Sequence, residues 1–164
     1  MEKKSATLDI TEYKNQLLSE IVNNPLIEEA IASTAKDYIQ GQGDTLIGRN
    51  VFPMFYVPDI QLESGTYIGC EAETIKVNAK NPSYHDIKIT IWVIAHRDSI
   101  YWPQKGCSRL DYISDKLRDM LQNSECYGYG TLNLTSNTSH LLNPKFSYRQ
   151  LQFKTVDLKK NFCR

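Results

Sequence analysis

Residues 87–96 read IKITIWVIAH, and apolar side chains occupy every second position of this run. The apolar parity contains Ile87, Ile89, Ile91, Val93 and Ala95. The other parity mixes charged, polar and apolar residues. Alternation of this kind is typical of a β-strand that packs one face on a core. The run therefore predicts a central strand of an antiparallel sheet that carries helices on one face.

Four further segments have the composition of strands: residues 51–57, 67–77, 127–134 and 145–156. Pro53 interrupts the first of them, which favours a bulged or edge strand. In the second, the apolar positions change parity after Ala72, as one extra residue in a β-bulge would cause. In the last two strands, the expected inward side chains are Leu132, Leu134, Leu151 and Phe153.

Two helices are predicted ahead of the strands, because apolar residues recur at helical spacing in residues 10–22 and again from residue 25. Asp9 and Glu12 are placed to form a capping pair at the start of the first helix. Asn24 is placed to cap the second, and Pro25 suits its first position. Glycines then break the pattern, so we expect a loop over residues 34–48.

A third helix is predicted between the central strand and the last two strands. Its apolar stripe consists of Leu110, Ile113, Leu117 and Leu121. Ser108 and Asp111 have the spacing of a capping box at its start, and we expect it to end near Gln122. The predicted order of elements is α-α-β-β-β-α-β-β. Without a βαβ alternation, this order favours an α+β fold with a mostly antiparallel sheet of about five strands and helices on one face.

The length and composition indicate a single globular domain. The chain has 164 residues, of which 41% are hydrophobic and 23% are charged. We expect a flexible N-terminus over residues 1–9, one α+β domain over residues 10–158, and a polar C-terminal tail over residues 159–164. No apolar run is long enough for a signal peptide or a membrane span, so we expect a soluble protein that is not exported.

The charge balance argues against a dedicated nucleic-acid binder. The 19 basic and 19 acidic residues cancel to a net charge of zero. A protein that binds the phosphate groups of a nucleic acid normally has a large excess of positive charge on its binding surface. A neutral chain also repels its own copies weakly, so self-association would be easy.

His96, Arg97 and Asp98 match three letters of the protein-kinase catalytic loop. In a kinase, a metal-binding Asn follows five residues after the Asp, but Pro103 occupies that position here. The chain also has no Gly-rich nucleotide loop and is too short for a kinase fold. We therefore interpret His96 as the last outward residue of the central strand and the next two residues as the start of a solvent-exposed connection.

Other catalytic and metal-binding patterns are also missing from the sequence. The three histidines have no partner at helical ligand spacing, and no GxSxG nucleophile motif occurs. The four cysteines show no CxxC spacing, and we expect reduced cytosolic thiols. The sequence predicts no catalytic residue, metal or cofactor, and a protein that is not an enzyme.

Aromatic residues in predicted loops and edges suggest a protein–protein interface. Tyr101 and Trp102 lie between a strand and a helix, where they either form a contact surface or fold back into the core; both alternatives are open. Tyr127 and Tyr129 alternate with glycines, and tyrosine gives contact area at little entropic cost. The candidate interface residues are Phe52, Phe55, Tyr56, Arg97, Tyr101, Trp102, Tyr127 and Tyr129.

Several segments together resemble the tail-terminator and neck (head–tail joining) proteins of tailed bacteriophages. They are NNPLIEEAI, LIGRNVFPMFYVPD, TYIGCEAE, IKITIWVIAH followed by RLDYISDKLRDML, YGYGTLNL and FSYRQLQFKTVDL, which lie between about residues 10 and 158. The resemblance implies six copies closed into a ring, with the tail-tube protein and the head–tail connector as partners. It also implies a virion protein at the neck, assembled in the bacterial cytoplasm, with DNA passing through the lumen.

The resemblance does not separate a tail terminator from a related head–tail adaptor. A different class also stays open, a small cytosolic enzyme or ligand-binding protein whose pocket is built from scattered residues. A third reading, a sequence-independent DNA binder, predicts salt-dependent binding that the neutral charge argues against.

Overall fold

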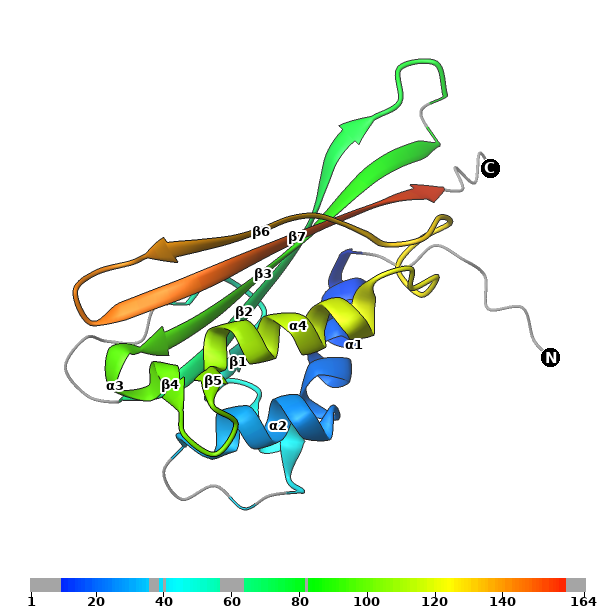
Figure 1. Ribbon diagram of the computed structural model, residues 1–164. Coiled ribbons are helices and arrows are strands. Elements are labelled where there is room, and N and C mark those ends of the chain that lie inside the picture. The colour runs from blue at the N-terminus through cyan, green and yellow to red at the C-terminus, as the bar shows by residue number, and fades with distance from the viewer. Residues whose placement is uncertain (1–9, 36–38, 40, 57–63, 82, 159–164) are drawn as a thin grey trace.

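The computed structural model describes residues 10–35, 39, 41–56, 64–81 and 83–158. Its main feature is one five-stranded mixed sheet (Figure 1). In spatial order, the strands are β1 (Val51–Phe52), β2 (Thr66–Val77), β3 (Tyr84–His96), β7 (Phe146–Leu158) and β6 (Asn133–Leu141). All neighbouring pairs are antiparallel except β1 and β2, which are parallel. The predicted central strand is thus the middle strand, β3.

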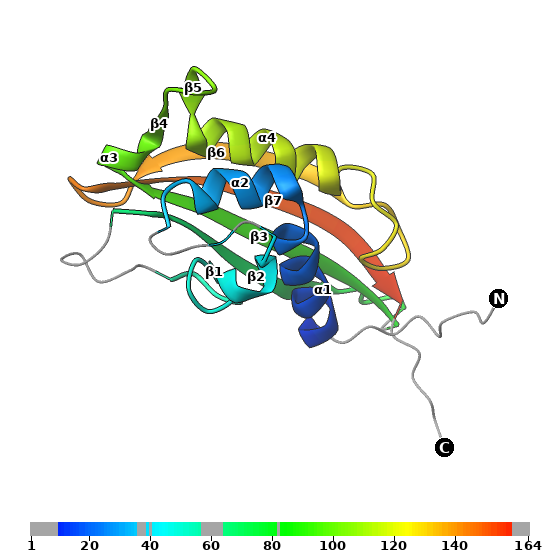
Figure 2. The ribbon, with the colours of Figure 1, turned by 90° about the horizontal axis from the view of Figure 1, so that it is seen from below.

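Helices cover one face of this sheet (Figure 2). The larger ones are α1 (Ile10–Val22), α2 (Pro25–Ala32) and α4 (Arg109–Leu121). Smaller elements are η1 (Gly43–Leu46), α3 (Arg97–Ile100), β4 (Tyr101–Trp102) and β5 (Cys107–Ser108). Apart from these short elements, the order agrees with the predicted α-α-β-β-β-α-β-β. The α+β fold with helices on one face is confirmed.

The core lies between the helices and the apolar parity of the strands. Ile89, Ile91 and Val93 of β3 have no exposed surface, and Leu151 and Phe153 of β7 are equally buried. The stripe of α4 contributes Leu110, Ile113, Leu117 and Leu121 to the same cluster. Alternation in β3 and helical spacing in α4 therefore direct their side chains to one shared interior.

Of the two predicted helix caps that lie in the described residues, one has the expected hydrogen bonds. The side-chain oxygen of Asn24 accepts hydrogen bonds from the backbone N–H groups of Leu26 and Ile27, so this cap is confirmed. The capping box at Ser108 is wrong, because Ser108 precedes α4 without a side-chain cap bond. Asp111 instead pairs with Arg149 of β7 at 2.6 Å. Asp9, the proposed cap of α1, lies outside the described residues.

Two strand predictions need correction. The first strand is only Val51–Phe52, since Pro53 follows directly and cannot donate to a ladder; residue 57 is outside the described part. The strand expected at 127–134 begins only at Asn133 and continues to Leu141. Gly128 adopts φ 132°, which places a loop where a strand was predicted. Leu132 is nevertheless buried, as expected.

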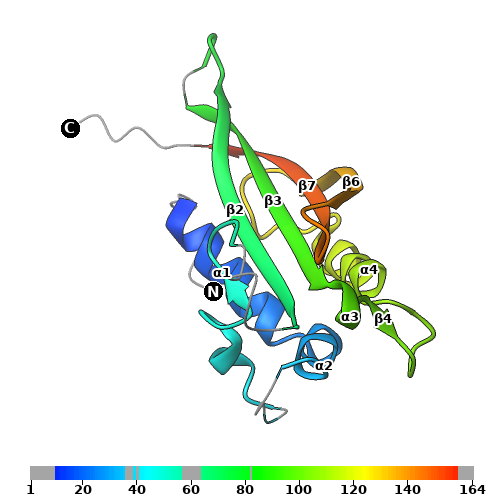
Figure 3. The same cartoon turned by 90° about the vertical axis from the view of Figure 1, so that its left-hand side faces the viewer.

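The hairpin between β2 and β3 extends beyond the helices (Figure 3). We call residues 73–81 and 83–88 the arm. The pairing register of β2 shifts between Thr74 and Lys76, which confirms the predicted bulge. Ile75, within this shift, and Val77, beyond it, are 42% and 48% exposed. The arm therefore carries apolar side chains into solvent. The proposed flexible N-terminus and polar C-terminal tail lie outside the described residues.

Candidate interaction surface

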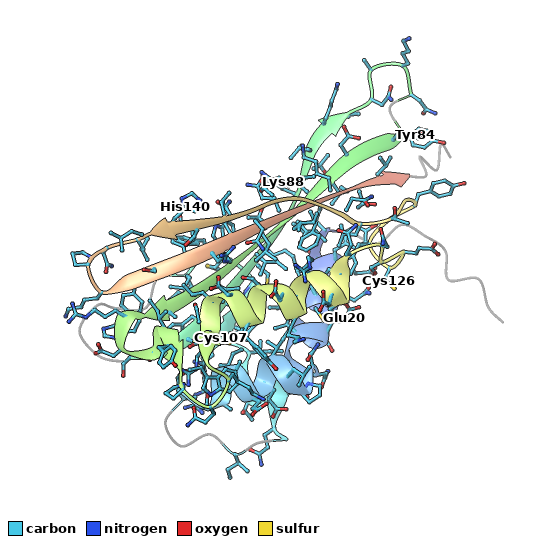
Figure 4. The ribbon with its side chains drawn as sticks, in the orientation of Figure 1. Glu20, Tyr84, Lys88, Cys107, Cys126 and His140 are labelled. Carbon is cyan, nitrogen blue, oxygen red and sulfur yellow. The ribbon has the colours of Figure 1, made fainter. Side chains whose placement is uncertain are left out.

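The sheet face opposite the helices, the outer face, carries a second apolar cluster. Tyr67, Ile94 and Phe146 are buried there, and Phe52, Trp92, Leu142 and Tyr148 pack against them. Figure 4 shows the labelled side chains of Lys88 and His140 on this side of the sheet, whereas Glu20 lies among the helices. The mixed parity of the central strand thus has an apolar end and a polar end.

A short segment after β1 crosses the outer face and covers part of this cluster. Its path depends on Gly69, because a Cβ atom there would meet the carbonyl oxygen of Met54 at 2.5 Å. Phe55 packs edge-on against Trp92, with ring centroids 5.1 Å apart, and lies 6.0 Å from Tyr148. Aromatic pairs at these distances contribute beyond simple burial.

Three of the candidate interface residues come together in this segment. Phe52 and Tyr56 stack with ring centroids 4.1 Å apart, next to Phe55. Phe55 and Tyr56 remain 40% and 39% exposed. The structure therefore places these three side chains in one partly exposed aromatic patch, which we call the aromatic patch.

Trp102 is buried and does not belong to an exposed surface. Its ring packs edge-on against Tyr112 at 5.3 Å, and the guanidinium of Arg109 lies 5.0 Å from its centroid. Of the two alternatives for Tyr101 and Trp102, each residue takes a different one: Tyr101 is 62% exposed. As a candidate for an exposed interface, Trp102 is wrong, because the β4–β5 turn folds its ring onto α4.

Arg109 is a buried arginine with several hydrogen bonds, and the sequence analysis did not predict its role. It is buried, and its Nη1 donates to the carbonyl oxygens of Ser99 at 2.7 Å and Tyr101 at 2.9 Å. Its Nε and Nη2 reach the Ser33 hydroxyl at 3.4 and 3.3 Å. Burial lowers the pKa of this guanidinium from its usual range. These contacts give it a structural role in joining α2, α3 and α4.

Tyr127 is also buried, so its assignment to an exposed interface is wrong. Its ring lies 6.1 Å from that of Tyr13, and its hydroxyl donates to the Glu20 carboxylate at 2.6 Å. Burial raises the pKa of the Tyr127 hydroxyl, and the hydrogen bond to Glu20 raises it further. The loop before β6 is thereby fastened to α1.

The remaining candidates are exposed. Tyr129 is 72% exposed, and Arg97 lies on the surface beside Asp98 with a closest contact of 3.6 Å. His96 Nδ1 accepts the backbone N–H of Asp98 at 3.3 Å, and its ring packs edge-on against Phe146. His96 is thus the last residue of β3, as predicted, and its side chain caps the start of α3.

The sequence reading also missed the outer edge of the sheet. In β6, the Thr138 hydroxyl and His140 Nε2 are 2.8 Å apart, and the His140 ring stacks on Tyr148 at 5.1 Å. Leu141 is 72% exposed at the end of this strand. The two threonines, Thr135 and Thr138, were the available signal for the strand, since β-branched Thr favours strands.

An open hollow of about 510 Å³ lies at the base of the arm. It is lined by Ile75, Asp86, Gly130, Thr131, Asn133, Lys154, Thr155 and Val156. Two opposite charges and two exposed apolar side chains meet there, which suits contact with a protein surface.

The only thiol buried in the described core, Cys70, has a pKa raised by burial and stays protonated at neutral pH.

The described residues contain neither a metal-binding cluster nor a membrane-spanning helix. No set of three or more His, Cys, Asp or Glu side chains in this part of the chain is arranged to hold a metal ion. None of its helices is both long enough and apolar enough to cross a membrane.

Comparison with known proteins gives one finding. Among curated proteins, no sequence matches the chain. The profile of the YomW family, however, matches residues 13–155, which include most of the five-stranded sheet, α2, α4, most of α1 and the aromatic patch. The family is named for a Bacillus phage or prophage gene, which indicates a phage-associated protein. The chain therefore belongs to the YomW family.

Proposed function

We propose that this protein is a tail terminator of a tailed phage or prophage. It forms a ring at the head-proximal end of the tail, stops polymerisation of the tail tube, and joins the tail to the head connector. Membership of a phage-associated family supports the setting. The sequence resemblance to tail-terminator and neck proteins supports the specific role.

The structural observation that carries the proposal is the half-covered sheet with exposed contact groups. The outer face holds the aromatic patch, and the arm projects Ile75 and Val77 into solvent. Exposed apolar and aromatic groups of this kind mark protein contacts. A small single-domain protein with several such regions is suited to bind copies of itself and two further partners.

The proposed mechanism is steric and needs no catalysis. One side of the ring covers the last layer of tube subunits, and the other is presented to the head connector. The net charge of zero suits a lumen through which DNA slides without being held. The protein would act in the virion neck, after assembly in the bacterial cytoplasm.

The experiment combines the purified protein with the tail-tube subunit of the same phage or prophage. We expect tubes to stop growing at a ring-capped end, and tubes without the protein to grow to uncontrolled length, as seen by negative-stain electron microscopy. In the phage, deletion of the gene is expected to give overlong tubes that lack heads. Normal tube length after deletion contradicts the proposal, and headless tails of normal length favour the head–tail adaptor instead.

A further inference from the structure

The strand directions suggest how copies of the chain join. Four consecutive strands of the sheet, β2, β3, β7 and β6, are antiparallel to their neighbours. Because the number of strands is even, the two outer ones, β2 and β6, run in opposite directions. When identical copies repeat around an axis in the same orientation, β6 of one copy is therefore antiparallel to β2 of the next.

The edge of β6 is unusually open for an outer strand. Its sequence, Asn133–Leu141, contains no Lys, Arg, Asp, Glu or Pro. Natural sheets normally block such an edge with charge, proline or a bulge, since free N–H and C=O groups accept further strands. In β6, only the first residues are blocked in this way. The pairing register shifts between Leu134 and Ser136, and the Leu134 N–H donates to the Gln122 side-chain oxygen. From Ser136 to Leu141, β6 pairs with β7 on one side only, and no described strand pairs with its other side.

The second open edge lies on the arm. β1 pairs only with Ile68 and Gly69 of β2, so no described strand pairs with this edge beyond Gly69. On the arm, the Glu73 carboxylate is paired with Lys88 at 2.6 Å. The exposed side chains of Ile75 and Val77 would gain apolar contacts from a neighbouring strand.

We infer that the arm edge of β2, residues Glu73–Val77, adds to the open β6 edge, residues Ser136–Leu141, of a second copy of this chain. The two surfaces differ, so the contact is head-to-tail and closes into a ring when the rotation allows. β6 contains no Lys or Arg to repel Lys76, and the zero net charge adds no long-range repulsion between copies. This inference rests on the proposed ring and names its interface.

Two pairs of substitutions test the two edges separately. The β6 variant is Ser139→Lys with Leu141→Lys, and the arm variant is Ile75→Glu with Val77→Glu; all four side chains are exposed. The control is Gln42→Lys with Gln104→Lys, which adds the same charge as the β6 variant at exposed positions outside both edges. Circular dichroism and thermal unfolding establish that each variant folds like the control.

Sedimentation velocity over a range of concentrations gives the readout. We expect the wild type and the control to assemble alike, and each edge variant alone to need about tenfold higher concentration, which corresponds to about 1.4 kcal/mol. An equimolar mixture of the two variants is expected to recover assembly, because β6 lysines then face arm glutamates in alternating copies.

Three results would overturn the inference. They are an arm variant that assembles like the wild type, as β6-to-β6 pairing would give; a mixture that does not recover; and a wild type that stays monomeric up to its solubility limit. None of these decides the proposed function, which depends on the separate measurement of tube length. Conversely, tubes of normal length in the absence of the protein would rule out the proposed function, even if the β6 edge and the arm edge are shown to pair.

Discussion

At the scale of single residues, Arg109 is notable because its positive charge is buried. It is a buried cation whose described hydrogen bonds go to two carbonyl oxygens and a hydroxyl, not to a carboxylate. The planar guanidinium suits this task, since its fork of donors reaches several acceptors at once. The sequence suggested only a helix start at this position. The acceptors come from turns and helix ends, so no local pattern announces them.

Replacing Arg109 by methionine is expected to lower the free energy of unfolding by about 2–4 kcal/mol, because the carbonyls of Ser99 and Tyr101 lose their donor in a buried site. Equilibrium denaturation in urea measures this change. Arg118→Met on the same helix is the control, since Arg118 forms only exposed ion pairs with Asp115 and Asp119; we expect a loss below about 1 kcal/mol. Equal losses in the two variants would contradict the assigned role.

Tyr127 gives a pH-dependent prediction. Its pKa is raised in the folded protein, so the protonated hydroxyl stabilises the fold fully below the unfolded pKa of about 10. Above that pH the unfolded state loses its proton first, and stability falls by up to about 1.4 kcal/mol per pH unit. Tyr127→Phe is expected to be about 1 kcal/mol less stable at pH 7.

The difference between wild type and Tyr127→Phe should be constant from pH 7 to pH 9 and should shrink above pH 10. Denaturant titrations at each pH measure it. Cys70 also has a raised pKa and contributes its own loss of stability at alkaline pH, but it is common to both proteins and cancels in the comparison. A difference that grows above pH 10 would contradict the buried, protonated hydroxyl.

At the scale of elements, the segments with strong periodicity were predicted well. β3 and α4 each bury one regular face, and the bulge in β2 left a visible change of parity. The region between α4 and β7 was predicted poorly. Tyr127 resembles a strand residue locally, but its hydroxyl bonds to Glu20, 107 residues away in the sequence. Contacts over that distance leave no local period.

Gly69 determines the path of the segment that follows β1, because Met54 and Phe55 lie directly against it. Gly69→Ala would place a methyl group against Met54 and Phe55, so we expect this segment to shift and the free energy of unfolding to fall by about 1–3 kcal/mol. The shift should also move Phe55 from Trp92 and change tryptophan fluorescence. In a Phe55→Ala background, Gly69→Ala should change the fluorescence little; an undiminished change would argue against this path.

At the scale of the whole molecule, the sequence predicted the layers but not which aromatic residues stay exposed. Phe52, Phe55 and Tyr56 share a patch because Gly69 lets their segment cross the sheet. Trp102 and Tyr127 have the same composition signal, yet loops fold both of them into the core. Exposure depends on where a loop returns, which is a property of the assembled domain.

The arm has a further consequence for the time course of amide hydrogen exchange. β2 begins beneath the helices, where Ile68 and Cys70 are fully buried, and ends at Val77 in solvent. Amide protons near Ile68 should exchange only through global opening, whereas those from Glu73 to Val77 should exchange through local opening, faster by orders of magnitude. Deuterium uptake measured by mass spectrometry should therefore divide this one strand into a slow half and a fast half.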